Sequence, residues 1–252
     1  MFCLNKFFKR FFDIVICLIA AIVLIPAWLI IPLAIKCDSK GPVFFKQERL
    51  TKHGRVFKMY KFRSMVVNAE SMDAGLFNYE NDPRVTKVGR VLRNLSLDEL
   101  PQIFNVIKGD LSIVGPRPCV KYELGDYETL NGKYKKRFTM PGGITGLAQI
   151  KGRNENSWEE KVEYDNEYID KFKRQGIWLD IKIIFGTFGK VFKKRNIYEK
   201  KADENMSDAE AAKYAEEEII YLAHLPDNDC GRTTEKQDKG TPGENDTQES
   251  EK

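Results

Sequence analysis

A run of 22 uncharged residues, Ile14 to Ile35, is interrupted near its middle by Pro26. About 20 apolar residues in a helix cross the ~30 Å hydrocarbon core of a bilayer, so the length of this run predicts a membrane segment. Proline lacks a backbone donor and clashes with the carbonyl four residues earlier, which predicts a kink or a break at Pro26. A straight transmembrane anchor is the alternative, because membrane helices tolerate proline.

Basic residues flank the apolar run on both sides and bear on its topology. Positive charge beside a membrane segment favours the cytoplasmic side. Both ends therefore favour the same side, and we expect residues 1–36 to form a re-entrant helix that enters, breaks and returns. The run is longer than that of a signal peptide and no small-x-small cleavage site follows it, so we expect it to be retained. The flanking basic residues are Lys6, Lys9 and Arg10 before the run, and Lys36, Lys40, Lys46 and Arg49 after it.

Charge is divided unevenly along the 252 residues. Met1 to Tyr198 carries 34 basic and 21 acidic residues, a net of +13, whereas the remainder carries 7 and 16, a net of −9. A basic surface beside a membrane segment suits anionic head groups and phosphate-bearing substrates. No recognised nucleic-acid-binding motif accompanies the charge, so nucleic acid is not an expected partner. The five cysteines form no C-x-x-C pair, which predicts neither a disulfide framework nor a zinc site.

The hydrophobic pattern predicts a mostly helical α+β fold with one small β-hairpin. Strands are expected over residues 43–45 and 56–60, around a turn that contains His53 and Gly54. Apolar residues recur at helical spacing from Val88 to Tyr198. Glycine- and proline-rich loops interrupt this helical region at Gly115–Pro118 and Pro141–Gly143.

Two of the expected helices carry large apolar side chains. They cover residues 100–107 and 177–192, and lysines are interleaved with aromatic residues in the second. A basic amphipathic helix of this kind can lie in the membrane interface. An ordinary core-facing helix with a solvated lysine face is the alternative. We therefore expect interfacial amphipathic helices packed on a compact cytosolic domain, residues 37–198.

Two adjacent carboxylates, Asp98 and Glu99, open an apolar helix shortly after Arg93. Ser96 and Glu99 fit a capping box, but Pro101 would then lack a hydrogen bond inside the helix. With Asp98 as the N-cap, Pro101 falls in the first turn and the carboxylate lies at the positive end of the helix dipole. Carboxylate, metal and phosphate could converge there. Spacing alone does not separate capping from catalysis.

A second loop presents Arg117 between Pro116 and Pro118. Proline fixes φ and stiffens the backbone on both sides of the arginine. A rigidly held guanidinium suits bidentate recognition of a phosphate. A solvated arginine in a loop rich in glycine and proline is the alternative interpretation.

These two stretches belong to a longer series of motifs, and the series carries a family resemblance. From about Lys6 to Arg195 the chain resembles the bacterial sugar transferases, in the minimal catalytic form of the monotopic phosphoglycosyl transferases. The motifs, in order, are Lys9-Arg10-x-x-Asp13, Tyr60–Met65, Leu95–Gln102, Lys108–Pro118, Pro141-Gly142-x-x-Thr145-Gly146 and Ala148-Gln149-x-x-Gly152-Arg153.

The resemblance implies roles for individual residues. Asp98 is implied to be the covalent nucleophile and a ligand for a Mg²⁺ cofactor, and Glu99 completes the catalytic dyad. Whether Glu99 acts as a base or orients the metal stays open. The family's membrane helix breaks at a proline that often follows a serine, whereas Ile25 precedes Pro26 here. Implied substrate-binding residues are Arg93 and Arg117 as phosphate contacts and, more weakly, Lys61 and Arg63.

The resemblance also implies a reaction and a place for it. A sugar-1-phosphate would pass from a UDP-sugar to polyprenyl (undecaprenyl) phosphate through an aspartyl-phosphosugar, releasing UMP. The catalytic domain would face the cytoplasm on the inner leaflet of the bacterial inner membrane, at the first membrane step of capsule, exopolysaccharide, O-antigen or glycoprotein glycan synthesis. Two alternatives are transfer without a covalent intermediate and a membrane-anchored, basic lipid-binding or scaffold protein without catalysis. No residue identifies the sugar.

Residues 199–252 form an acidic tail outside the resemblance. Ser207 and Glu210 fit a capping box before a helix that reaches about Ala223. Beyond Pro226 there is little apolar side chain to bury, so we expect disorder there. The low apolar content predicts that the tail is dispensable for the chemistry.

Overall fold

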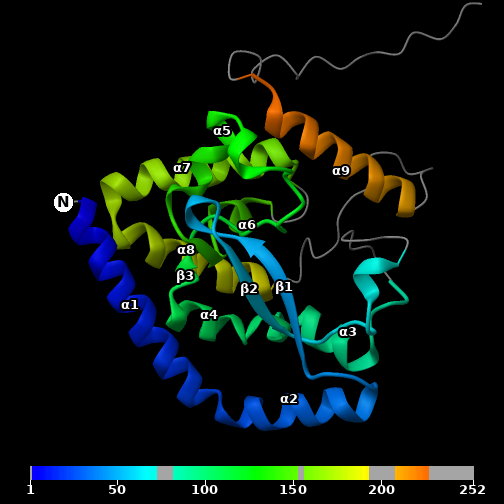
Figure 1. Ribbon diagram of the computed structural model, residues 1–252. Coiled ribbons are helices and arrows are strands. Elements are labelled where there is room, and N and C mark those ends of the chain that lie inside the picture. The colour runs from blue at the N-terminus through cyan, green and yellow to red at the C-terminus, as the bar shows by residue number, and fades with distance from the viewer. Residues whose placement is uncertain (1, 73–81, 153–155, 193–207, 227–252) are drawn as a thin grey trace, which may run out of the picture.

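The computed structural model describes residues 2–72, 82–152, 156–192 and 208–226 (Figure 1). These residues are mostly helical with two small sheets, which agrees with the predicted α+β class. The helices are α1 Phe2–Val23, α2 Ile25–Asp38, α3 Lys87–Asn94, α4 Gln102–Lys108, α5 Gly132–Lys136, α6 Leu147–Lys151, α7 Trp158–Gln175, α8 Ile177–Phe192 and α9 Asp208–His224. The strands are β1 Phe44–Leu50, β2 Val56–Phe62, β3 Leu111–Val114 and β4 Gly142–Thr145.

The N-terminal apolar run folds as a bent pair of helices, α1 and α2, which lie at 64° to each other. The break is at Leu24, and Pro26 is in the first turn of α2, where a missing N–H costs no helical hydrogen bond. The Trp28 indole crosses the break and donates to the backbone oxygen of Ala21 at 3.1 Å. Within the described ranges no single helix is long and apolar enough to cross a membrane, and only this bent pair could do so, by length and composition.

The motif Lys9-Arg10-x-x-Asp13 fastens α1 to the rest of the protein. The Lys9 ammonium lies 2.6 Å from a carboxylate oxygen of Asp180 on α8, and both side chains are buried. Arg10 donates to two backbone carbonyls near the end of α4, at 2.6 and 3.0 Å. The Asp13 carboxylate accepts from the hydroxyl of Ser112 on β3 at 2.6 Å. This family motif therefore joins the apolar helix to the domain.

The end of α2 is fastened to the same domain. The Asp38 carboxylate accepts from the backbone N–H of Val88 at the start of α3, at 2.9 Å. The guanidinium of Arg63, which follows β2, donates to the backbone oxygens of Ser39 and Lys40 at 2.7 and 3.0 Å. Both ends of the bent pair are thus held by one folded unit, with α1 along its left side and α2 beneath it in Figure 1.

The predicted hairpin is present and is longer than expected. β1 and β2 are antiparallel and pair continuously from Phe44 with Phe62 to Leu50 with Val56. His53 in the connecting turn has a left-handed backbone with φ 57°, as a tight reversal requires.

A second sheet, which the sequence pattern did not reveal, pairs β3 with β4 in parallel. It joins the segment before Arg117 to the loop that begins at Pro141. Both strands have only four residues, and β4 begins with two glycines, Gly142 and Gly143. The sequence pattern therefore predicted a loop here and not a strand. Gly142 pairs with Leu111 and Thr145 with Val114, so the loop that follows β3 must turn back along β4 to reach Gly143.

The helix predicted in the acidic tail is present as α9, whereas the expected disorder beyond Pro226 falls outside the described residues. Ser207, the proposed cap, lies outside the described residues, but the helix is present. Ile219, Leu222 and Ala223 are buried in a core cluster that also contains residues of β1, α5 and α7. The domain boundary expected after residue 198 therefore divides segments that share one hydrophobic core.

Candidate active site

Asp98 and Glu99 lie in the short 3₁₀ turn Leu97–Glu99 between α3 and α4. Ser96 begins this turn with a left-handed backbone, φ 56°, and the described structure gives its side chain no capping hydrogen bond. Pro101, not Asp98, occupies the N-cap position of α4. Both capping interpretations are therefore wrong, and neither carboxylate is used to begin the helix.

Glu99 is the centre of an ion-pair cluster built from three parts of the chain. Its Oε1 lies 2.9 Å from Arg117 Nη2, in the loop after β3, and 3.4 Å from Lys61 Nζ on β2. The Glu99 and Lys61 side chains are 15% and 17% exposed, whereas Arg117 is 40% exposed. The structure thus brings together the dyad and two of the predicted substrate-binding residues, with the arginine closest to solvent.

The buried Asp98 carboxyl experiences opposing electrostatic effects. Burial raises its pKa, and the neighbouring charge of Glu99 raises it further. Lys61, Arg93 and Arg117 act in the opposite direction, with Lys61 the strongest of the three. The carboxylate form that a nucleophile requires is therefore disfavoured by burial and supported by three surrounding cations.

Glu99 also changes the acid–base behaviour of its two partners. It raises the pKa of the Arg117 guanidinium, so this group stays charged. Burial lowers the pKa of Lys61, and the Glu99 charge opposes that effect. Glu99 therefore holds two cationic side chains next to Asp98 and favours their charged forms.

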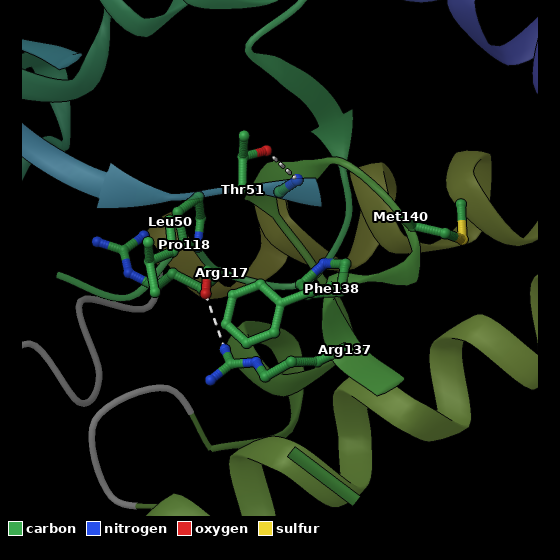
Figure 2. A pocket seen from close by; sticks show the side chains of 9 residues that line it. Leu50, Thr51, Arg117, Pro118, Arg137, Phe138 and Met140 are labelled. Atoms are coloured by element: carbon green, nitrogen blue, oxygen red, sulfur yellow. Dashed lines mark hydrogen bonds between the residues drawn. The ribbon is translucent and has the colours of Figure 1, made fainter. Parts of the chain in front are cut away.

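Two further arginines, which sequence reasoning missed, hold the backbone directly after the Arg117 side chain. Arg137 Nη2 donates to the backbone oxygen of Arg117 at 2.8 Å, and Figure 2 shows this bond beside the small cavity behind the loop. Arg49 Nη1 donates to the backbone oxygen of Pro118 at 2.7 Å. Both arginines are distant from Arg117 in sequence, so no local pattern could have identified them.

Arg137 is itself held by a buried carboxylate on α7. Asp165 Oδ2 lies 2.8 Å from Arg137 Nη2, and both side chains are almost fully buried. Burial raises the pKa of Asp165 to about 6, while the Arg137 charge opposes the rise. The Arg117 loop thus rests on a buried ion pair.

The two glycine-rich loops pack directly against each other beneath this site. The Gly143 N–H donates to the backbone oxygen of Pro116 at 2.8 Å, and the Gly115 N–H donates to that of Thr145 at 2.9 Å. A Cβ atom on Gly143 would lie 2.1 Å from the backbone nitrogen of Gly115. Only glycine at position 143 permits so close an approach of the two backbones, so the packing of the two loops depends on this residue.

The other two predicted substrate-binding residues differ in their placement. Arg93, on α3, lies near enough to Asp98 to lower its pKa. Arg63 is buried and directs its guanidinium to Ser39 and Lys40 at the end of α2. These hydrogen bonds give Arg63 a structural role, and its weak assignment to substrate binding stays a prediction.

The carboxylates limit how a divalent cation could bind. The described residues contain no group of three or more His, Cys, Asp or Glu side chains suited to a metal. Mg²⁺ commonly binds through one or two carboxylates together with waters and substrate phosphates. Glu99 is engaged by Arg117 and Lys61. Asp98 therefore fits a Mg²⁺ site in which one carboxylate comes from the protein and the remaining ligands are waters and substrate phosphates.

Comparison with known proteins identifies the family. A family model described as "Bacterial sugar transferase" matches residues 4–194. The chain is 45% identical over 200 residues to the UDP-glucose:undecaprenyl-phosphate glucose-1-phosphate transferase of Klebsiella pneumoniae, covering 77% of this chain and 42% of that protein. It is 43% identical over 197 residues to galactosyl transferase CpsE of Streptococcus agalactiae, covering 71% and 41%.

A shorter relative matches over most of its length. The exopolysaccharide production protein ExoY of Sinorhizobium fredii is 39% identical over 204 residues, covering 75% of this chain and 88% of that protein. Against the longer relatives, this chain spans only about two fifths of their length. Since the family model covers well over half of the chain, including the dyad and both arginine-bearing segments, the protein belongs to the bacterial sugar transferase family.

Proposed function

We propose that this protein transfers a sugar-1-phosphate from a UDP-sugar to undecaprenyl phosphate and releases UMP. The observation that carries the proposal is the turn in which a buried Asp98 lies next to Glu99, with Lys61 and Arg117 gathered on that glutamate. Both substrates are anions. The half-exposed Arg117 can bind a phosphate group, and the buried Asp98 carboxylate can attack its phosphorus atom. Relatives are named for UDP-glucose, UDP-galactose and undecaprenyl phosphate, which agrees with this chemistry.

The reaction proceeds in two displacements at one phosphorus atom. A carboxylate oxygen of Asp98 attacks the β-phosphorus of the UDP-sugar, an oxygen–phosphorus bond forms, and UMP leaves with the electrons of the broken bond. An oxygen of undecaprenyl phosphate then attacks the phosphosugar on Asp98 and restores the carboxylate. Covalent catalysis divides a difficult displacement between two anions into two easier steps.

Glu99 serves in this scheme to organise the cations. Its contacts with Arg117 and Lys61 fix two positive groups beside the nucleophile before substrate binds. Preorganised charges of this kind stabilise negative charge that develops at a transferring phosphoryl group. Mg²⁺, held by Asp98 together with the donor phosphates, would neutralise further charge.

We propose that the bent pair re-enters the cytoplasmic leaflet. Both of its ends are fastened to one domain, through Lys9 and Arg10 at the start and Asp38 at the end. A helix that crossed the bilayer would carry one end to the opposite side. The outward side chains of the pair are apolar and suit lipid. Large exposed examples are Phe7, Phe11, Ile22, Val23, Leu29, Ile30 and Leu33.

Helix α8 continues this apolar surface and fits both interpretations made from sequence. Leu179 and Ile183 are buried in the core, as in an ordinary amphipathic helix. On its other face Trp178 and Phe185 are 73% and 72% exposed. Because α8 also contacts α1, we propose that this aromatic face lies in the membrane interface.

A UMP-release assay across a panel of UDP-sugars tests the function. With undecaprenyl phosphate in detergent or nanodiscs, at least one UDP-sugar should give continuous UMP release. Without the acceptor, the covalent scheme predicts one UMP per enzyme and then no further turnover. A single displacement gives no such burst. Absence of release with every UDP-sugar would favour the scaffold alternative.

Arg117→Lys tests whether the guanidinium fork recognises a phosphate. Lysine retains the charge but loses the planar pair of donors, so we expect a loss of ~1–3 kcal/mol of interaction in kcat/KM, roughly 5- to 150-fold. Arg55→Lys is the matched control, because Arg55 is largely exposed and pairs with Asp110 away from the dyad. Equal kcat/KM in the Arg117 variant and the wild type would indicate a solvated arginine instead.

A further inference from the structure

Helix α9 lies beyond the region that matches the family, yet it covers part of the structure that leads to the active site. The family match ends at residue 194 and α9 begins at Asp208. The buried residues of α9 share a core cluster with side chains of the segment 119–131, which connects the Arg117 loop to α5. The shared members are Ile219, Leu222 and Ala223 from α9, and Cys119, Leu124 and Leu130 from the segment.

Polar contacts fix the end of α9 against the same segment. Asn131 donates its backbone N–H to the Ala223 oxygen at 3.0 Å and its side-chain amide to the Leu222 oxygen at 3.1 Å. The His224 ring Nε2 lies 2.9 Å from the hydroxyl of Thr129. Asn131 also accepts from the backbone N–H of Tyr134 and so caps α5. The helix is therefore docked by specific hydrogen bonds as well as by apolar contact.

The segment that α9 covers begins two residues after Arg117 and has little secondary structure of its own. Apart from the single 3₁₀ turn Tyr127–Thr129, its described residues form no helix or strand. Its start is joined to β1, because the Leu50 N–H donates to the Cys119 oxygen at 2.9 Å and Arg49 pairs with Val120. An irregular segment of this kind depends on tertiary packing to stay fixed.

We propose that α9 is an intramolecular clamp that holds the segment 119–131 and thereby positions Arg117 for phosphate binding. The part that concerns phosphate rests on the proposed function, whereas the clamp itself does not. Leu124 and Leu130 belong to the core cluster that α9 helps to form, so loss of α9 would remove part of the packing around the segment. The role of α9 is positioning, since none of its described residues contacts the dyad in any interaction that the structure gives.

Amide hydrogen exchange in the full chain tests the clamp without any substrate. Leu222→Asp places a charge in the core cluster, and Tyr221→Asp places the same charge on the exposed face of the same helix turn. We expect exchange within residues 119–131 to rise about tenfold or more in the first variant and to stay unchanged in the second. Exchange in β2 and α4 should stay at the wild-type level in both. Unchanged protection of 119–131 in Leu222→Asp would overturn the proposal.

A milder variant keeps the test informative if Leu222→Asp does not fold. Ile219→Ala removes part of one buried side chain, and it should raise exchange in 119–131 in the same direction by a smaller factor. It should also lower kcat/KM for the UDP-sugar about 3-fold or more. In an Arg117→Lys background the same change should have no further effect on kcat/KM, because coupled residues are not additive.

The double variant separates positioning from general destabilisation. If Ile219→Ala lowers kcat/KM equally in both backgrounds, α9 does not act through Arg117 and the positioning role is wrong. If the wild-type protein releases no UMP, the proposed function fails, while the exchange experiment still decides whether the clamp exists.

Discussion

Replacing Asp98 with asparagine should reduce UMP release by on the order of 10⁴-fold or more, the scale seen when a covalent nucleophile is removed. The amide has nearly the same shape as the carboxyl group but cannot form the acyl phosphate. Because burial raises the pKa of Asp98, ionisation of this group at neutral pH opposes folding. A carboxyl group whose pKa is higher in the folded than in the unfolded state lowers the free energy of unfolding as the pH rises through the two pKa values. Asparagine removes the ionisation, so the variant should be at least as stable as the wild type at pH 7.

The expected outcome is thus an inactive protein with an unchanged or higher Tm. Asp170→Asn is the matched control, because Asp170 is half-exposed and pairs with Lys136 and Lys173 on the surface. That control should retain full turnover. Incubation of the wild type with labelled UDP-sugar and no acceptor, followed by digestion and mass spectrometry, should place the phosphosugar on Asp98. Label on another residue would refute the assignment.

The residues that meet at the candidate site could be picked out because they occur in short motifs, while their chemical roles stay predictions. Asp98 and Glu99 are adjacent, and two prolines flank Arg117, so local sequence marks both. Their relationship could not be predicted, since it depends on β2 and the loop after β3 meeting at Glu99. The same limit explains Arg63, which stands in a family motif but contacts the end of α2.

The remaining misses have physical causes of the same kind. Arg49 and Arg137 donate hydrogen bonds to backbone carbonyls that are distant in sequence. Every residue has a backbone carbonyl, so the amino-acid sequence does not indicate which carbonyl an arginine contacts. Helix α9 was predicted, but its packing was not, because among its described residues three side chains enter the core cluster, too few to stand out in a strongly acidic segment. The break in the apolar run was predicted correctly, because proline acts through its own covalent structure.

The topology of the bent pair gives the second large effect, an all-or-none change in labelling. Cys37, exposed at the end of α2, and a Leu4→Cys substitution at the exposed start of α1 provide two reporters when the other cysteines are replaced. In intact cells neither should react with a membrane-impermeant thiol reagent, and both should react once the inner membrane is opened. Labelling of position 4 in intact cells would show that the pair spans the bilayer.

The same reporters measure what maintains the re-entrant state. A proline destabilises the interior of a helix by about 3 kcal/mol. Pro26→Leu removes this cost and so favours a straight span. Straightening would separate Lys9 from Asp180, and breaking a buried ion pair costs about 3–5 kcal/mol. Since the two amounts are comparable and Arg10 adds two hydrogen bonds to α4, Pro26→Leu alone should leave position 4 shielded.

Combining Pro26→Leu with Lys9→Met removes the anchor together with the break, and position 4 should then become reactive in intact cells. Pro32→Leu is the matched control, because Pro32 lies inside α2 and the break lies eight residues earlier at Leu24. That variant should stay shielded even with Lys9→Met. If Pro26→Leu alone exposes position 4, the proline outweighs the anchor. If the double variant remains shielded, Arg10 and Asp13 suffice to hold α1 against the domain, and the topology is determined by the folded protein more than by the apolar run.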